Sequence, residues 1–367
     1  MSRLERAIDM ARLLRRGGPA ICNIAVTNVC NATCDFCNFA YDKGLVTHRT
    51  YIDVEDYRKA LDILYRRGIR YLTFQGGEPL LHPHIVNMVA AATAKGMGPA
   101  LVTNAWLLPK KLDALAEAGL KTIFISIDSA SAAEHEANRG LKGVCARIGE
   151  ANRRMIERGM TPLASVAMNK LIGDYRALVP FLQELGFAAV SFSYPRKAAL
   201  GSSSLVYSED SSLVDFTPDE LVAAFQAVDA LRGEFTVHNP QASLADMQRH
   251  VRGEREAFPC FGGYKHFYMD WKLDLYRCEA WDKPMCSIWD FERTPLIRDG
   301  CTACMTDCYR DSSVMLHFAV SLGDALDHLG RGRVDKAADA LFTRQNFRSA
   351  KAVFDHSRIL ARLGALG

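Results

Sequence analysis

The sequence has no long hydrophobic run. Although 49% of its 367 residues are hydrophobic, no stretch reaches the roughly 20 apolar residues that a membrane-spanning helix needs. The opening segment MSRLERAIDMARLLRRGG is charged throughout and therefore lacks the apolar part of a secretory signal peptide. These absences predict a cytoplasmic protein, and the length allows one large domain plus a smaller one.

The sequence also has little excess charge, no internal repeats and no low-complexity tract. Its formal net charge of +3 is too small to indicate a nucleic-acid partner. Near the start, Leu4, Ala7, Ile8, Ala11 and Leu14 share one helical face beside several arginines. This face indicates either an amphipathic helix packed on the main domain or a surface-seeking helix in peripheral contact with a membrane.

Cysteine is the residue type whose distribution is most informative. Nine of the eleven cysteines form two groups, one near the start of the chain and one in its last third: Cys30, Cys34 and Cys37, then Cys260, Cys278, Cys286, Cys301, Cys304 and Cys308. In a reducing compartment, clustered cysteines are more often metal ligands or catalytic groups than disulfides. Cys22 and Cys145 stand apart and are interpreted as buried apolar side chains.

From residue 20 onward, short apolar runs alternate with amphipathic segments that end in glycine, as helices commonly do. The apolar runs predict six strands, at residues 22–26, 70–74, 99–103, 122–127, 162–168 and 188–194. Regular β–α alternation predicts a parallel sheet, either an incomplete barrel or an open sheet. In both, the site lies at the carboxyl ends of the strands, where the first cysteine group follows strand 22–26.

The helical and strand periods fade after Tyr194. The Ser-rich stretch 200–215 predicts a linker or lid, and residues 217–253 predict two helices around a short strand. Residues 258–310 are rich in Cys, Asp, Trp and Gly, which is typical of a small fold held by metal. The predicted divisions are an N-terminal helix (1–19), the βα core (20–195), a linker with a helical extension (196–257), a Cys-rich domain (258–311) and C-terminal helices (312–367).

The first cysteine group has CX3CX2C spacing. Three thiolates can hold three corners of a [4Fe–4S] cluster and leave the fourth iron open for a substrate or cofactor. Zinc with a fourth ligand elsewhere is the alternative that this spacing leaves open. The next predicted strand ends in QGGEPLLHP, where Gly76 and Gly77 allow a close backbone approach to a ligand and Glu78 adds no useful zinc geometry.

Together these two motifs resemble the signature of the radical S-adenosylmethionine (SAM) superfamily. That signature is CX3CX2C with an aromatic residue before the third cysteine, here Phe36, and a GGEP turn after the next strand. The segments 102–108, 125–130 and 135–155 are similar as well, so the resemblance covers roughly residues 20–195. It implies a partial (β/α)6 barrel in which a [4Fe–4S] cluster binds SAM.

The reaction that this resemblance implies is reductive cleavage of SAM to a 5′-deoxyadenosyl radical, which abstracts a substrate hydrogen or adds to a double bond. A flavodoxin-type or ferredoxin-type electron donor is implied as a partner. Cys30, Cys34 and Cys37 would then be the cluster ligands. Substrate identity, the fate of SAM and the oligomeric state do not follow from the resemblance.

The resemblance also implies residues that contact SAM. Gly76, Gly77 and Glu78 would line its methionine end, with the Glu78 carboxylate accepting from the ammonium group. The main chain at Phe36 would meet the adenine edge. Further candidates for the ribose or the carboxylate group are Asn104, Ser126, Asp128, Arg139 and Asn169. Helix capping is the alternative role for Ser126 and Asp128, and a surface ion pair is the alternative for Arg139.

The segment FYMDWKLDLYRC (267–278) resembles the hairpin of SPASM and twitch domains, which carry auxiliary clusters in many radical SAM enzymes. Asp274 stands where their pattern usually has glycine. The twitch arrangement implies Cys286 and Cys308 as alternates or free thiols. It implies four ligands for a second [4Fe–4S] cluster, with structural zinc as the alternative: Cys260, Cys278, Cys301 and Cys304. Four ligands would favour electron transfer, and three would favour substrate binding.

The substrate is the property on which the sequence is least informative. The CX17C layout and the segment 301–315 faintly resemble radical SAM enzymes of hopanoid lipid biosynthesis. No extra peptide-recognition segment precedes residue 20. These observations predict a small-molecule or lipid-like substrate. The alternatives are a peptide-modifying maturase of the SPASM type and a non-catalytic iron–sulfur or zinc-binding module.

Overall fold

The computed structural model describes residues 3–39, 48–195 and 211–362. Within these residues the strands form one sheet in the order β6-β5-β4-β3-β2-β1-β7-β8-β9. All pairs from β6 to β7 in this order are parallel, whereas β8 pairs antiparallel with both β7 and β9. The strand bounds are β1 (Ala20–Ala25), β2 (Ile69–Gln75), β3 (Gly98–Thr103), β4 (Thr122–Ile127), β5 (Thr161–Ala167), β6 (Ala189–Ser193), β7 (His266–Met269), β8 (Asp274–Tyr276) and β9 (Cys286–Ser287).

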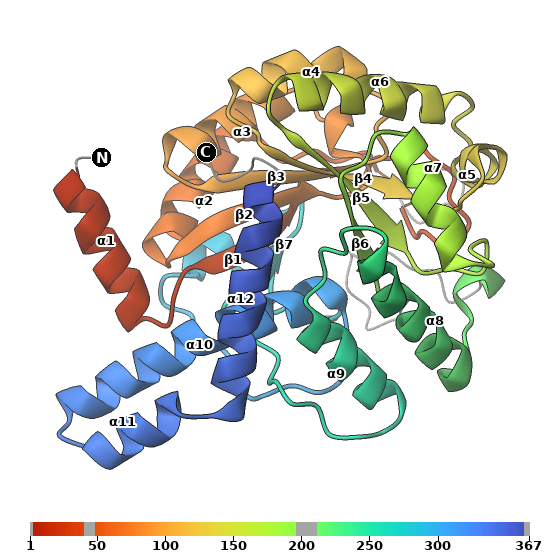
Figure 1. The fold of residues 1–367 in the computed structure, drawn as a ribbon. Coiled ribbons are helices and arrows are strands. Elements are labelled where there is room, and N and C mark those ends of the chain that lie inside the picture. The colour runs from red at the N-terminus through yellow and green to blue at the C-terminus, as the bar shows by residue number, and fades with distance from the viewer. Residues whose placement is uncertain (1–2, 40–47, 196–210, 363–367) are drawn as a thin grey trace.

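The helices between the strands cover one side of this sheet, as the arch above the strands in Figure 1 shows. The bounds are α1 (Arg3–Arg15), α2 (Val54–Arg66), α3 (Ile85–Ala94), α4 (Leu108–Glu117), α5 (Ala132–Arg139), α6 (Val144–Glu157), α7 (Leu178–Glu184), α8 (Pro218–Ala230), α9 (Gln241–Val251), α10 (Asp307–Gly330), α11 (Val334–Leu341) and α12 (Arg344–Arg362). The predicted partial (β/α)6 arrangement is confirmed, because β1 to β6 alternate with helices and run parallel.

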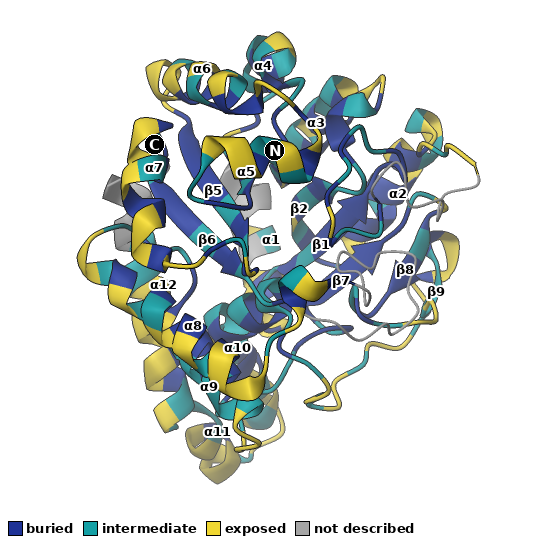
Figure 2. Ribbon diagram, turned by 90° about the vertical axis from the view of Figure 1, so that its right-hand side faces the viewer, coloured by how far each residue is buried: buried dark blue, intermediate teal, exposed yellow. Residues whose placement is uncertain are grey.

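Alternation of side chains along the strands creates two different faces. In β4, Ile123, Ile125 and Ile127 are buried in the core against the helices. Phe124 and Ser126 point to the other side, where the Phe124 ring contacts that of His238. We call this second side the inner face. Figure 2 shows the strands mostly buried and the outward sides of the helices exposed.

The Cys-rich segment extends the barrel sheet instead of folding apart from it. β7 pairs in parallel with β1 from Ile21 opposite His266 to Ile24 opposite Met269, and β7 and β8 form the hairpin predicted at 267–278. At its turn Leu273 has a φ of 66°. The Asp270 carboxylate stabilises this turn by accepting from the Lys272 amide (2.8 Å) and the Asp274 amide (3.0 Å). The residue with a left-handed backbone conformation in this turn is therefore Leu273. Asp274, which stands where the SPASM and twitch pattern usually has glycine, is the next residue.

Several predicted elements differ in detail. Helix α5 was not predicted, and α10 begins at Asp307, inside the range 258–311 assigned to the Cys-rich domain. The strand predicted between α8 and α9 is only an isolated bridge between Val190 and Val237. Most of the predicted linker 200–215 lies outside the described residues. None of the described helices has the length and apolar character that spanning a bilayer requires.

Candidate functional site

Cys30, Cys34 and Cys37 lie in the loop after β1, at the predicted carboxyl edge of the sheet. The thiols are close enough to influence one another: burial and the neighbouring Cys37 raise the pKa of Cys30 to about 12. Burial also raises the pKa of Cys34 well above its usual range. The thiols of Cys30 and Cys34 are therefore protonated in the absence of a metal, and a bound metal would be needed to keep them as thiolates.

Main-chain hydrogen bonds hold one side of this loop against the end of β2. The Gly77 amide donates to the Thr27 carbonyl oxygen (3.0 Å), and the Glu78 amide donates to that of Val29 (2.8 Å). A Cβ atom at Gly76 or Gly77 would clash with the same carbonyl oxygens. Glycine is therefore required here by the close approach of the cysteine loop itself.

Helix α5 holds the other side of the loop. The Thr33 amide donates to the Arg139 carbonyl oxygen (2.9 Å), and the Asp35 amide donates to the side-chain oxygen of Asn138 (3.2 Å). Gly140, at the left-handed C-cap of α5, has no room for a Cβ atom because the Thr33 side chain lies there. The cysteine loop is thus fixed between two main-chain anchors.

Glu78 is buried and ties the end of β2 to the end of β3. One carboxylate oxygen accepts from the Thr103 hydroxyl (2.7 Å) and the Leu80 amide (2.9 Å), and the other accepts from the Asn104 amide (2.7 Å). Burial raises the pKa of Glu78, although these hydrogen bonds oppose the effect. A carboxylate has about four acceptor sites, so one stays available to a ligand.

Two of the other predicted SAM contacts, Asn104 and Asn169, form hydrogen bonds within the protein, whereas Ser126 and Phe36 differ from each other in burial. The Asn104 amide group donates to the Asn31 side chain (2.9 Å) and so fastens the cysteine loop. The Asn169 amide group donates to the carbonyl oxygens of Asp128 (2.9 Å) and Ala167 (2.7 Å), which joins β4 to β5. Ser126 is half-buried on the inner face, and Phe36 is buried.

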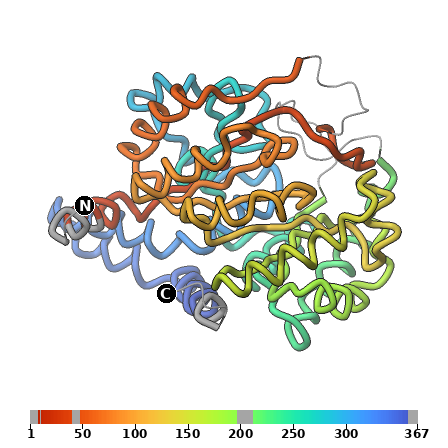
Figure 3. The backbone as a smooth tube through the Cα atoms, turned by 90° about the horizontal axis from the view of Figure 1, so that it is seen from above, coloured from red at the N-terminus to blue at the C-terminus, as the bar shows by residue number. Residues whose placement is uncertain are grey.

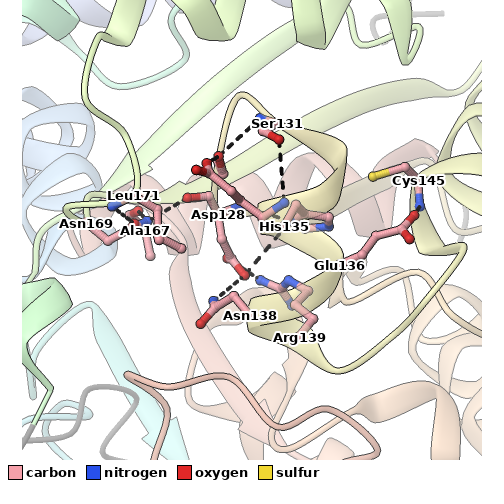
Figure 4. Close-up of polar contacts among 12 residues, drawn as sticks. Asp128, Ser131, His135, Glu136, Asn138, Arg139, Cys145, Ala167, Asn169 and Leu171 are labelled. Atoms are coloured by element: carbon pink, nitrogen blue, oxygen red, sulfur yellow. Dashed lines mark hydrogen bonds and ion pairs between the residues drawn. The ribbon is translucent and has the colours of Figure 1, made fainter.

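Asp128 and Arg139 form a buried ion pair (Figure 4), and both charges act on the Cys34 thiol. One Asp128 oxygen accepts from Arg139 Nη2 (2.6 Å) and the other accepts from Asn138 Nδ2 (2.9 Å). Because Asp128 is 0% and Arg139 7% exposed, the alternative of a surface ion pair is wrong for Arg139. Helix capping is wrong for Asp128 as well, because Ser131 caps α5.

The Arg139 side chain interacts electrostatically with the Cys34 and Cys30 thiols and has one N–H donor that no described residue uses. Burial alone would lower its pKa, but the charges of Asp128 and Cys34 raise it above the usual range. Its Nε is buried and has no hydrogen-bond partner among the described residues. An unpaired guanidinium N–H on a residue that interacts with the Cys30 and Cys34 thiols suits an anionic group such as the cluster or the carboxylate of SAM.

His135 is a buried neighbour that sequence reasoning missed. Its Nδ1 accepts from the Asp128 amide (3.1 Å), so the proton of the neutral ring is on Nε2, which has no partner among the described residues. Burial lowers the pKa of His135 to about 4. The glycine after Arg139 and the spacing of His135 and Arg139 on one helical face were the available signals for this helix.

Residues 24–173 match the family model of the radical SAM superfamily. The chain therefore carries a radical SAM domain. The matched range contains the three cysteines, the GGEP turn and the Asp128–Arg139 pair. The predictions of this domain and of its cofactors, a [4Fe–4S] cluster and SAM, are confirmed, and the unpaired donor of Arg139 beside the thiols fits them.

Curated relatives of the radical SAM domain include two enzymes named GTP 3′,8-cyclase. The one from Chlorobaculum tepidum is 40% identical over 108 residues, which is 29% of this chain and 32% of the relative. The one from Alkaliphilus metalliredigens is 32% identical over 145 residues, which is 38% of this chain and 44% of the relative. This chain thus covers less than half the length of either relative.

Two solved structures share the fold. SuiB of Streptococcus suis bound to S-adenosylmethionine has a TM-score of 0.54 and 17% identity, and the match covers 75% of this chain and 64% of that chain. The enzyme anSMEcpe with bound AdoMet also has a TM-score of 0.54, with 13% identity over 95% of this chain and 100% of that chain. At these identities the likeness extends to the fold alone.

Outside the radical SAM domain, four cysteines of the second group lie near one another. Burial raises the pKa of Cys260, and the charges of Cys304 and Cys301 add to this effect. Burial and the neighbouring Cys304 and Cys260 raise the pKa of Cys278 to about 12. Cys260, Cys278, Cys301 and Cys304 are thus the predicted four-ligand set that the structure brings together.

The two remaining cysteines lie elsewhere. Cys286 is in β9, beside Thr294 and Arg67. Cys308 is in the first turn of α10, where its thiol accepts weakly from the Asn23 amide group (3.8 Å) and lies near Cys278. Cys286 is therefore separate from the four-thiol group, whereas Cys308 borders it from the inner face.

Arg277 links the loops that carry the four thiols. Its two terminal nitrogens donate to the two oxygens of Asp299 (2.8 Å each), and one of them also donates to the Gly262 carbonyl oxygen (3.3 Å). The same Asp299 accepts from the Cys301 amide (3.2 Å). One guanidinium group thus joins the segments around Cys260, Cys278 and Cys301.

The spacing of the described side chains bears on the zinc alternative. Among the described residues, no three His, Cys, Asp or Glu side chains are placed so that they could hold one metal ion. Four sulfurs around zinc lie about 2.3 Å from a single ion and must crowd together, whereas each thiolate of a cluster binds its own iron. Neither cysteine group is thus a preformed single-ion site among the described residues.

Proposed function

We propose that this protein is a radical SAM enzyme that modifies a small-molecule biosynthetic substrate. When bound, the [4Fe–4S] cluster and SAM together supply a 5′-deoxyadenosyl radical, and the substrate undergoes hydrogen abstraction or radical addition. The observation that carries the proposal is the buried, unpaired donor of Arg139, a residue that interacts electrostatically with Cys34 and Cys30, within the matched domain.

The chain's own residues position the cofactors in this proposal. Cys30, Cys34 and Cys37 hold the cluster. Glu78 offers its remaining acceptor site to the ammonium group of SAM, while the Arg139 Nε–H donates to an anionic group of the cofactor. Asp128 acts through Arg139 and is a positioning residue.

The remaining predicted contacts follow from their places in the fold. Gly76 and Gly77 let the β2 turn meet the cysteine loop, Phe36 lies within that loop, and Asn104 fastens it. Asn169 positions Asp128 through its carbonyl oxygen. Ser126, on the inner face, is the candidate for a hydroxyl contact to the ribose.

For the second cysteine group we propose an auxiliary [4Fe–4S] cluster ligated by Cys260, Cys278, Cys301 and Cys304. Four protein ligands leave no open iron, which favours electron transfer over substrate binding. Cys286 and Cys308 are then free thiols. None of the eleven cysteines is in a disulfide, which is consistent with a reducing, cytoplasmic location. An electron donor of the flavodoxin or ferredoxin type would then supply the electron.

The inner face supports a polar substrate over a lipid-like one. Glu279 accepts from the side-chain amides of Asn23 (2.7 Å) and Gln75 (2.6 Å). Asp307 accepts from the Tyr194 amide (3.1 Å), and Asp311 accepts from the Asn239 side chain (2.8 Å). Burying an apolar substrate against these carboxyl and amide groups would leave them without solvent, at a cost of free energy.

The test is anaerobic incubation of the reconstituted protein with SAM and dithionite, followed by mass spectrometry of 5′-deoxyadenosine. Wild-type protein is expected to form it, and SAM is expected to change the absorption spectrum of the cluster. A colourless protein, or an intact cluster spectrum that SAM leaves unchanged with no 5′-deoxyadenosine, would contradict the proposal.

The substrate class is tested with extracts from cells grown in deuterated medium and separated into small-molecule and peptide fractions. The small-molecule fraction is expected to transfer deuterium into 5′-deoxyadenosine or to yield an adenosylated product. Activity confined to the peptide fraction would instead support a peptide-modifying maturase.

A further inference from the structure

A second feature of the molecule is a cavity of about 770 Å³ at the edge of the sheet opposite the cysteines. It lies between the end of α1, the starts of β1 and β2, and α10, on the side where α1 and the C-terminal helices meet (Figure 3). The six residues of β1 separate it from the cysteine loop, a distance of roughly 20 Å. We call it the arginine cavity, after the cationic side chains of its lining: Arg12, Arg15, Arg16, Arg66, Arg67 and Lys265.

The acidic side chains of the lining neutralise only part of this charge. They are Glu292, Asp324 and Asp327. Glu292 is paired with Arg66 (2.7 Å), and Asp324 is paired with Arg298 (2.6 Å) outside the lining. Six cations therefore face three carboxylates, two of which already have a partner.

The two most enclosed cations of the cavity contact carbonyl oxygens instead of carboxylates. The Lys265 side chain, in a residue only 5% exposed, donates to the carbonyl oxygens of Gly18 (3.0 Å) and Arg16. Arg67 donates to the carbonyl oxygens of Glu292 (3.3 Å) and Thr294 (2.8 Å), and its buried Nε has no partner among the described residues. Neither side chain forms a salt bridge with a carboxylate among the described residues, although Glu292 and Asp324 act on them electrostatically.

The pKa values of Arg67 and Lys265 reflect repulsion among the cations of the cavity. Burial and the nearby Arg16 lower the pKa of Arg67. Burial, Arg298 and Arg16 lower the pKa of Lys265 to about 8. Like charges held together in a partly buried cavity destabilise one another, and an anion bound between them would relieve that cost.

The rim of the cavity is apolar. Leu14 (39% exposed) lies on α1 next to the cavity residues Leu13 and Arg15, and Leu296 (39% exposed) is part of the lining. Further along α1, Ile8 is 43% exposed, so the apolar face predicted for this helix is open in the described part. Cations beside exposed apolar side chains suit a phosphate group at an apolar boundary.

From the cavity and its charges we propose that the arginine cavity binds a phosphate-bearing anion. Phosphate oxygens match the fork of N–H donors on arginine, and several arginines surround one space of sufficient volume. The phosphate can come from the headgroup of an anionic membrane lipid or from a soluble phosphate ester. This site is independent of the radical chemistry, because it lies at the other edge of the sheet.

The first experiment measures binding of inorganic pyrophosphate to the full chain by thermal shift and calorimetry. Sodium chloride of equal ionic strength is the reference. Pyrophosphate is expected to raise the melting temperature of the wild type above that reference. The double variant Arg12→Gln/Arg15→Gln removes two exposed cavity cations that have no ion-pair partner among the described residues, and it is expected to weaken binding about tenfold. The matched control Arg153→Gln/Arg255→Gln removes two exposed charges elsewhere and is expected to bind as the wild type does.

The second experiment distinguishes the two sources of phosphate. Vesicles of phosphatidylcholine, with or without phosphatidic acid, are sedimented with the protein. Sedimentation only with phosphatidic acid, reversed by pyrophosphate, assigns the site to a lipid headgroup. Pyrophosphate binding without sedimentation assigns it to a soluble phosphate ester. Binding in neither assay, or equal loss in the test and control variants, would overturn the proposal.

Discussion

The two cysteine groups are held in place in different ways. Main-chain contacts on both sides fix the first loop, and the charges of the buried Asp128–Arg139 pair act on its Cys34 thiol. In the second group a side-chain pair between Arg277 and Asp299 joins the loops, and the side chain of Asp299 is 52% exposed. A cluster site with three protein ligands must also position the molecule that coordinates the fourth iron. A site with four protein ligands only has to bring those ligands together. The comparison indicates that the first cysteine group, whose proposed cluster has an open iron, has the more rigid and more highly charged surroundings.

The largest effect that separates the two groups is expected in metal content and activity. Cys34→Ser should leave about four irons per chain instead of about eight and abolish formation of 5′-deoxyadenosine. Cys260→Ser should also lose about four irons yet keep uncoupled SAM cleavage. Iron analysis and mass spectrometry check both variants.

The control for this pair is Cys286→Ser, whose thiol lies apart from the four-thiol group. It is expected to keep the full iron content and wild-type SAM cleavage. If Cys260→Ser lost zinc instead of iron, the second group would be a structural zinc site and the comparison would change.

A smaller contrast is expected in stability between the two ion pairs. Asp128→Asn leaves the Arg139 charge buried without its partner, which should lower the free energy of unfolding by about 3–5 kcal/mol. Asp299→Asn should cost less, about 1 kcal/mol, because the Asp299 side chain is 52% exposed even though that of Arg277 is 4% exposed. Urea unfolding of the two variants measures both values, and equal losses would show that the two sites are equally rigid.

The smallest expected effect is on the pH dependence of stability. The pKa of His135 is about 4 in the folded chain, against an ordinary value of 6.5. Between these values the unfolded chain binds more protons, so stability is fully present above pH 6.5 and is lost as the pH falls towards 4. His135→Gln should remove up to about 1.4 kcal/mol per pH unit of that slope. Urea unfolding of the wild type and of His135→Gln between about pH 4 and pH 7 measures this slope, and an unchanged slope would contradict the prediction.

Local patterns were sufficient to predict the barrel core and the first cysteine loop. Strands β1 to β6 are short apolar runs that alternate with segments of helical hydrophobic periodicity. Each of these patterns arises because a face of that segment is buried. The loop cysteines and the GGEP turn lie close in sequence, and the sheet topology alone brings both to one edge. These features depend on neighbouring residues and on a general rule of parallel sheets.

Long-range contacts account for what was missed. The role of Arg139 depends on its burial against Asp128, which spacing alone does not reveal. The pairing of β7 with β1 joins segments from opposite ends of the chain, and no local pattern encodes it. The choice among the six later cysteines likewise depends on Arg277 and Asp299. Helix α5 is short and polar, so its amphipathic signal was weak, although it carries His135 and Arg139.

The β1–β7 ladder has one more consequence. The strand that leads into the first cysteine loop is hydrogen-bonded to the strand that leads, through one hairpin, to Cys278. If both proposed clusters are present, a single sheet fixes the gap that an electron must tunnel between them. Neighbouring strands lie about 4.8 Å apart, and no hinge interrupts the ladder between Ile21 and Ile24. Turnover then changes the charge on either cluster without changing the distance between the two clusters.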